Sequence, residues 1–298
     1  MLNQKFDTLI LGQISFDINV DHEGNTVHEI GGAVVFSGHA ASALGHRVCA
    51  LPKANTSDID LRAIFSKASN VKVIPLNSQT STSIENIYHT ADKERRTCRA
   101  VSRIEPYRLE EIPSVDASIY HIAGLMRGDL GNEIIIHAGQ KALAAVDVQC
   151  LLRCAEGQEG VMAFHDWPEK REMLPYIHFL KTDAAEAEIM TGLTDRAQAA
   201  RLLQSWGANE VMITHNTEVL VYDGEEVYTQ PLKPRNLTGR SGRGDTCFSS
   251  YITERLTRSI PEALRTAAAL VSLKMEKPGP FLGSREDVNS YIDNYYNK

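Results

Sequence analysis

Short apolar runs alternate with helix-patterned segments along most of this chain. The runs that we interpret as buried strands are 7–12, 71–76, 118–123, 160–164, 177–181 and 210–214. Between them, apolar residues recur at helical spacing over 132–146 and 195–207. Because a strand followed by a helix usually pairs in parallel with the next strand, the alternation predicts an α/β fold with a mostly parallel central sheet and helices on both faces. In such sheets, ligands bind beyond the carboxyl ends of the strands.

Two segments interrupt this alternation early in the chain. Residues 14–32 and 76–104 each hold two short strand-like runs around a turn. Paired with each other, they would form a small β-sheet that could act as a lid over a substrate cleft. The alternative is two surface hairpins without that role. The lid interpretation divides the chain into an α/β core of 1–13, 33–75 and 105–298 and a lid of 14–32 and 76–104.

Charge and cysteine content narrow the functional classes. The 298-residue chain has a net charge of −7, which disfavours nucleic acid as a general partner. No apolar run reaches the length of a membrane span, and the first residues lack the layout of a signal peptide. The five cysteines form an odd, scattered set, which is typical of reduced thiols. We therefore expect a cytoplasmic protein that binds neither nucleic acid nor membrane.

The string SGRGDT, residues 241–246, places two glycines directly before an acid and a helical pattern. Gly242 and Gly244 let the backbone approach a ligand closely, and the helix is expected to begin near Asp245. Unpaired N–H groups and the helix dipole at such an N-terminus attract an anion. An N-capped helix after an ordinary turn is the alternative. The string is not a P-loop, because no Gly-Lys-Ser/Thr follows the glycines.

Other small and acidic residues lie near the predicted strand ends. Gly31 and Gly32 precede a helix rich in small residues, where backbone can lie against a hydroxylated ligand or simply against a neighbouring helix. Asp17 lies just past the first strand and could accept hydrogen bonds from substrate hydroxyls, although an isolated loop aspartate is usually only solvated. Asp183 and Glu186 fall in the first turn of a helix, where acids favour the dipole and could also orient water around a nucleotide-bound magnesium ion.

Taken in this order, the strings resemble the ribokinase-like (PfkB-type) carbohydrate kinase family over nearly the whole chain. SGRGDT is similar to the family's C-terminal signature, which implies that Asp245 is the catalytic base and that the backbone of Gly242, Arg243 and Gly244 is the anion hole. The implied activity is phosphoryl transfer from ATP, with Mg²⁺, to a hydroxyl of a small sugar, polyol or nucleoside. The alternative is a non-catalytic nucleotide or sugar sensor on the same fold.

The resemblance also implies roles for other positions. The substrate site would include Asp17, Gly31, Gly32 and Phe36. The nucleotide site would include Asp183, Thr214, Asn216 and Gly279. Glu186 would contact magnesium through water. A monovalent cation and a homodimer that pairs through the lid are further features that the resemblance raises.

Four of these residues depart from the family pattern. Phe36 stands where an Asn commonly contacts the sugar, Asp183 replaces an Asn, Asn216 replaces a Gly and Arg243 replaces a small residue. A ring at position 36 favours a substrate with an apolar face, unless Phe36 turns into the core and a neighbour replaces the lost contact. The base, its glycines and Glu186 are present, so catalysis is expected.

Overall fold

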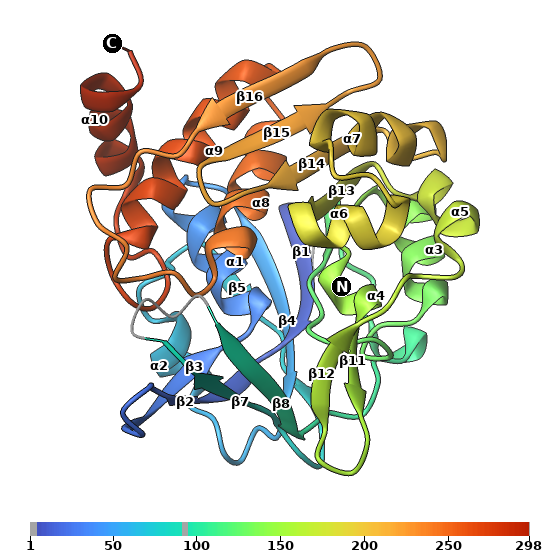
Figure 1. Ribbon diagram of the computed structural model, residues 1–298, viewed down its shortest axis with the longest axis vertical. Coiled ribbons are helices and arrows are strands. Elements are labelled where there is room, and N and C mark those ends of the chain that lie inside the picture. Colours follow the sequence, from blue (N-terminus) through green and yellow to red (C-terminus); the bar gives the residue numbers. More distant parts are fainter. Residues whose placement is uncertain (1–4, 91–94, 298) are drawn as a thin grey trace.

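The structure, a computed structural model, describes residues 5–90 and 95–297 and contains a large and a small β-sheet (Figure 1). In order across it, the large sheet consists of β16 (Val227–Pro231), β15 (Glu218–Tyr222), β14 (Glu210–Thr214), β13 (Phe179–Asp183), β10 (Leu143–Asp147), β9 (Ala117–Ile122), β1 (Phe6–Gln13), β4 (Val48–Ala54) and β5 (Val71–Val73), with β6 (Leu76–Asn77) also paired to β4. Neighbouring strands from β14 to β5 are parallel, whereas β15 is antiparallel to both of its neighbours, β14 and β16. The predicted mostly parallel central sheet is confirmed.

Helices cover both faces of the large sheet (Figure 1). One side carries α1 (Ala33–Ala43), α8 (Arg243–Glu254), α9 (Ile260–Met275) and α10 (Arg285–Tyr295). The other side carries α3 (Asn132–Lys141), α6 (Ala184–Thr191) and α7 (Arg196–Ser205). Three short helices complete the described chain: α2 (Leu61–Phe65), α4 (Gln149–Leu152) and α5 (Lys170–Met173). In β14, Met212 packs with α8 and α9, whereas Val211 and Ile213 pack with the helices of the other face. This alternation explains why the parallel strands are apolar throughout.

Two parts of the large sheet differ from the sequence interpretation. Residues 132–146, predicted as one helix, form α3 and then β10. The second half is an apolar run that suits a buried strand as well as a helix, and its place between β9 and β13 decides the outcome. β4 is buried along its whole length and had no counterpart among the predicted strands.

The small sheet combines three segments of the chain. Its order is β11 (Arg153–Glu156), β12 (Val161–Phe164), β8 (Arg96–Ser102), β7 (Thr82–Tyr88), β2 (Ser15–Val20) and β3 (Thr26–Gly31). The predicted separate sheet is therefore present, and parallel pairing of β2 with β7 joins the two interrupting segments. Residues 160–164 were predicted as a buried strand; the strand is present as β12, but it belongs to the small sheet and Phe164 is 40% exposed. Residues 91–94 of the turn predicted at 90–94 lie outside the described residues.

No helix within the two described ranges is long and apolar enough to cross a membrane.

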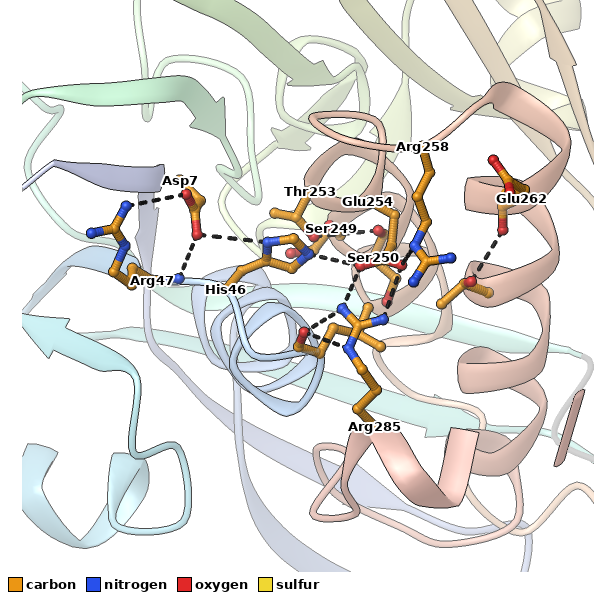
Figure 2. A network of polar contacts seen from close by, with 12 residues as sticks. Asp7, His46, Arg47, Ser249, Ser250, Thr253, Glu254, Arg258, Glu262 and Arg285 are labelled. Atoms are coloured by element: carbon orange, nitrogen blue, oxygen red, sulfur yellow. Dashed lines mark hydrogen bonds and ion pairs between the residues drawn. The ribbon is translucent and has the colours of Figure 1, made fainter. Parts of the chain in front are cut away.

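A buried carboxylate fixes the C-terminal end of α8 (Figure 2). Glu254 is 1% exposed and contacts His46 Nε2 at 2.8 Å, Arg258 Nε at 2.8 Å and Arg285 Nη2 at 2.6 Å. Burial raises the pKa of Glu254, but hydrogen bonds from His46 and Arg285 outweigh burial and hold the pKa at about 2. Since His46 follows α1 and Arg285 begins α10, this one carboxylate ties α8 to two neighbouring helices.

Glu254→Ala is expected to lower the free energy of unfolding by about 3 kcal/mol, since the partly buried Arg285 and the more exposed Arg258 lose their counter-charge. The depressed pKa means that this contribution is present above the ordinary glutamate range and is lost as the pH falls toward 2. Urea unfolding should therefore show a larger difference from the unmodified chain near neutral pH than near pH 3. The control is Arg47→Ala, which breaks an ion pair with Asp7 at 3.8 Å. Since the Arg47 side chain is 52% exposed, this variant should lower the free energy of unfolding by less than about 1 kcal/mol. Equal losses in both variants would contradict the role of Glu254.

Candidate active site

The carboxyl ends of the central parallel strands bring several charged residues together. Asp147 at the end of β10 lies in register with Lys181 in β13, and Lys181 Nζ is 2.8 Å from Asp147 Oδ2. Asp183 at the end of β13 lies in register with Thr214 at the end of β14. The cluster lies at the sheet edge where the alternating sequence pattern predicts a ligand site.

The N-terminus of α8 opens onto this edge. Gly242 is the residue before the first helical turn, at φ +73°, and no side chain caps the helix. In the first turn, the N–H groups of Arg243 and Thr246 have backbone acceptors, at 3.4 Å and 3.0 Å. Within the described chain, the N–H groups of Gly244 and Asp245 have no such acceptor and remain available to an external anion. The structure therefore supports an anion site at the predicted glycines.

The Phe36 side chain packs against this turn. A Cβ on Gly242 would lie 2.2 Å from the Phe36 ring, so the ring packs directly against the glycine backbone. The side chain is only 6% exposed. Phe36 thus packs under the anion-binding turn, and a contact between its ring and a substrate stays a prediction. The physical reason is that the missing side chain of Gly242 leaves a space that the ring fills.

Asp245 lies in the first turn of α8, beside the open N–H groups. Burial and then the negative charge of Asp147 raise the pKa of Asp245 to about 6, while the positive charges of Lys181, Arg153 and Lys274 oppose the shift. A carboxylate with a pKa near 6 is ionised at neutral pH and is a stronger base than an ordinary aspartate. This environment suits the predicted catalytic base.

Lys181 lies against the first turn of α8. A Cβ on Gly244 would lie 3.1 Å from Lys181 Nζ, so the glycine admits the ammonium next to the helix backbone. Burial lowers the pKa of Lys181, but Asp147 and Glu186 reverse the effect and raise it well above its ordinary value. Lys181 is therefore positively charged beneath the anion site.

Asp17 forms a second polar centre, in β2 of the small sheet. Burial raises its pKa, and a hydrogen bond with Ser15 opposes the shift. Its Oδ1 atom is buried and has no hydrogen-bond partner in the described residues. A Cβ on Gly31 would lie 2.4 Å from Asp17 Oδ2, so only glycine leaves room for the carboxylate. Gly32 is at φ +104°, and a Cβ there would lie 2.3 Å from the Gln13 carbonyl oxygen.

Asp183 and Glu186 cap α6 reciprocally. Asp183 Oδ1 accepts from the Glu186 N–H at 2.8 Å, and Glu186 Oε2 accepts from the Asp183 N–H at 2.8 Å. Burial raises the pKa of Glu186 to about 7, although the charge of Lys181 opposes the shift. The second carboxylate oxygen of Glu186 accepts no hydrogen bond within the described chain, so it can contact water.

The predicted nucleotide residues are partly joined by contacts. Asn216, in the turn after β14, accepts from Arg243 Nη1 at 3.0 Å, which links this turn to the anion site. Thr214 is 5% exposed, and its hydroxyl lies 3.5 Å from the Thr182 carbonyl oxygen. Gly279 lies in the loop after α9 at φ +78°, with open space where a side chain would be.

Several charged residues of the site were not identified from the sequence. Asp147 and Lys181 were missed as a pair because β10 was taken as part of a helix. Arg153 begins β11, is partly buried, and acts electrostatically on both Asp17 and Asp245. Lys274 was missed because the last turn of a helix is an ordinary place for lysine. A polar residue at the end of a correctly assigned strand would have identified Asp147.

The carboxylates of the site that the structure describes are not arranged to bind a metal ion directly. The described residues hold no group of three or more His, Cys, Asp or Glu side chains arranged to bind a metal ion. Magnesium usually keeps several waters and binds largely through substrate phosphates, so a single carboxylate that contacts water is sufficient. The free oxygen of Glu186 fits that indirect role.

Comparisons with known proteins agree with this geometry. The model of the pfkB family of carbohydrate kinases matches residues 9–286. A cytidine kinase of Thermococcus kodakarensis is 25% identical over 266 residues, which is 83% of this chain and 87% of the relative. A solved pyrophosphate-dependent kinase in the ribokinase family, complexed with a pyrophosphate analogue and myo-inositol, is 30% identical with a TM-score of 0.85, over 95% of this chain and 99% of the other. Arabidopsis thaliana ribokinase, complexed with ribose and ATP, is 16% identical with a TM-score of 0.76, over 97% of this chain and 99% of the other.

Gly242→Ala is expected to destabilise the chain by about 3 kcal/mol, because a side chain there is strained at positive φ and overlaps the Phe36 ring. It should also weaken sulfate binding about tenfold by displacing the N–H groups. Gly192→Ala is the matched control, since Gly192 has φ +75° but no atom within 4 Å of the added Cβ, so only the strain of about 1 kcal/mol remains. Urea unfolding and sulfate-dependent thermal shifts measure both effects. Similar behaviour of the two variants would show that Phe36 does not support the turn.

Proposed function

The chain belongs to the pfkB family of carbohydrate kinases, and from this we propose that it transfers a phosphoryl group from ATP to a hydroxyl of a small sugar, polyol or nucleoside. The observation that carries the proposal is Asp245, a carboxylate with a pKa of about 6 beside the open N-terminus of α8. That pair combines a base with an anion site, which are the two elements that phosphoryl transfer to a hydroxyl requires.

The proposed reaction uses groups of this chain in sequence. Asp245 accepts the proton of the attacking hydroxyl, whose oxygen forms the new bond to the terminal phosphorus of the donor. The bond from that phosphorus to the bridging oxygen breaks, and ADP leaves. The backbone of Gly242, Arg243 and Gly244, with Lys181 beneath it, stabilises the negative charge on the transferring group. Glu186 would hold, through water, a magnesium ion bound with the donor phosphates, and that ion would supply positive charge to offset theirs.

On the acceptor side, we assign Asp17 to binding a substrate hydroxyl. Its buried Oδ1 atom has no partner within the described chain, and a hydroxyl donor would satisfy it. Gly31 and Gly32 keep the neighbouring space free of side chains. The small sheet that carries Asp17 is proposed as the lid, because closure would exclude water from the donor.

The predicted homodimer through the small sheet stays a prediction. Four large apolar side chains are exposed on this sheet: Val27, Ile30, Val101 and Phe164. Exposed apolar side chains on a sheet are typical of a subunit contact. Sedimentation of the whole chain would test it, and a monomer at high concentration would remove it.

Arg243 favours a second candidate donor, inorganic pyrophosphate. The residue begins α8 within the anion site and bonds Asn216 of the predicted nucleotide turn, so a guanidinium lies on the donor side where the family pattern has a small residue. A guanidinium binds phosphate oxygens in pairs and suits a donor made only of phosphate. The similar pyrophosphate-dependent kinase adds support for this donor.

Asp245→Asn is expected to lower turnover on the order of a hundredfold or more while substrate binding persists. In the unmodified chain, kcat/KM should fall as the pH drops below about 6, because the base must be deprotonated. Product formation from a panel of sugars, inositols and nucleosides measures both. Asp195→Asn is the control, because Asp195 also lies at a helix start, where Asn caps equally well. Near-normal turnover in Asp245→Asn would remove this residue from the mechanism.

Arg243→Ala separates the two donors. If pyrophosphate is the donor, the variant should lose about tenfold or more in kcat/KM with pyrophosphate, because a charged phosphate contact is removed. If ATP is the donor, the variant should retain most of its activity with ATP, since a small residue suits the family pattern. Initial rates with each donor at saturating acceptor provide the measurement. A variant with unchanged pyrophosphate kinetics would rule out the donor role of Arg243.

A further inference from the structure

The loop that leads into the anion site encloses a buried ammonium group. Lys274, in the last turn of α9, is 2% exposed. Its Nζ atom donates to the Gly239 carbonyl oxygen at 2.7 Å and also to the Ser241 carbonyl oxygen. These two carbonyls come from the loop directly before Gly242, so the ammonium binds the backbone that shapes the anion site.

Phe36 covers another side of the same ammonium. Lys274 Nζ lies 5.3 Å from the centre of the Phe36 ring, a cation–π contact. The ring also packs against Gly242. One aromatic side chain therefore contacts both the cation and the anion-binding turn.

The loop packs closely against the residues at the end of α9. The Gly239 N–H donates to the Met275 carbonyl oxygen at 2.8 Å, and the Thr238 hydroxyl donates to the Glu276 carbonyl oxygen at 2.6 Å. A Cβ on Gly239 would lie only 1.8 Å from the Lys277 carbonyl oxygen. The inward carbonyls that could bind a dissolved alkali cation are thus already occupied by Lys274. The monovalent cation that the family resemblance raised does not fit here.

The ammonium is held without a direct counter-ion. Among the described residues, no carboxylate lies within ion-pair distance of Lys274. Burial lowers its pKa to about 8, and the charges of Asp245 and Glu29 oppose the shift. It is therefore mostly protonated at neutral pH. Burying an ammonium costs free energy, which carbonyl and ring contacts offset in part.

We propose that Lys274 is a built-in monovalent cation, which holds residues 239–241 in the conformation that exposes the anion-binding N–H groups. The chain then needs no dissolved alkali cation to bind the donor phosphates. Lys274 is a positioning residue that acts through the loop. The inference deepens the proposed function, but its anion-binding test does not depend on turnover.

The test measures binding of inorganic pyrophosphate by calorimetry at constant ionic strength. The supporting salt is tetramethylammonium, sodium, potassium or methylammonium chloride. The unmodified chain should bind equally, within about twofold, in all four. Lys274→Ala should bind about tenfold or more weakly in tetramethylammonium chloride, because the loop loses its cation. Potassium or methylammonium should restore part of that affinity, since either ion can enter the vacated space.

Two further variants separate positioning from general stability. Lys274→Met fills the space without a charge, so it should bind weakly in every salt. Lys233→Ala is the matched control: Lys233 Nζ donates to the Tyr295 carbonyl oxygen and lies 5.0 Å from the Tyr296 ring centre, away from the anion site. Its loss should leave pyrophosphate binding and cation response unchanged. If Lys274→Ala fails to fold, the proposal is tested by comparing the pyrophosphate affinity of Lys274→Met with that of the unmodified chain.

Potassium-dependent binding by the unmodified chain, or normal binding by Lys274→Met, would overturn the proposal. Absence of pyrophosphate binding to the unmodified chain would overturn it as well. If binding follows the expected pattern but no acceptor is phosphorylated, the proposed function fails and the role of Lys274 stands. If Lys274→Ala still turns over and its donor kinetics do not depend on the added cation, the proposed function is retained and Lys274 has no part in it.

Discussion

The site depends on the placement of one helix, α8, with its N-terminus open at the carboxyl edge of the sheet. At its far end, Glu254 is bonded to groups that flank α1 and α10 (Figure 2). Along its length, α8 packs between α1 and α9, and the Ser249 hydroxyl donates to the Ser37 carbonyl oxygen at 2.8 Å. At its near end, Gly242 lies on the Phe36 ring. A helix fixed at both ends keeps its first-turn N–H groups oriented without a side-chain cap, so they stay available to a ligand.

This placement brings charges of opposite sign together in a site that is partly shielded from water. Asp147 and Lys181 form a buried pair, and next to it the pKa values of Asp245 and Glu186 rise to about 6 and about 7. Burial is the main cause for both carboxylates, so the site disfavours negative charge that lacks a counter-cation. A donor that arrives with magnesium brings both signs of charge. The pKa of Asp245 thus reflects the same desolvation that strengthens the anion site, and base strength and phosphate binding have one physical origin.

The sequence predicted the parts of the fold that local pattern controls. Strands buried on both faces, the glycines before α8 and the separate small sheet follow from periodicity, glycine placement and turn residues. The division between α3 and β10 did not, because an alanine-rich apolar run has no decisive period and only pairing with β9 and β13 makes it a strand. That error concealed Asp147. Arg153 and Lys274 were beyond local reasoning, since their roles arise from a strand that joins the small sheet and from a helix end that meets a distant loop.

Three of the four departures from the family pattern become related once they are placed in space. Phe36 contacts Gly242 and Lys274, and Arg243, the next residue after Gly242, bonds Asn216. These three positions adjoin the turn that is proposed to receive phosphate, whereas Asp17, Gly31 and Gly32, on the proposed acceptor side, keep the family pattern. Replacing an amide by a ring at position 36 removes a polar group, and the buried Lys274 ammonium lies against that ring. If the proposed site is correct, these departures alter chiefly how the chain holds the donor phosphate, so a change of donor or of cation requirement follows more directly from them than a change of acceptor.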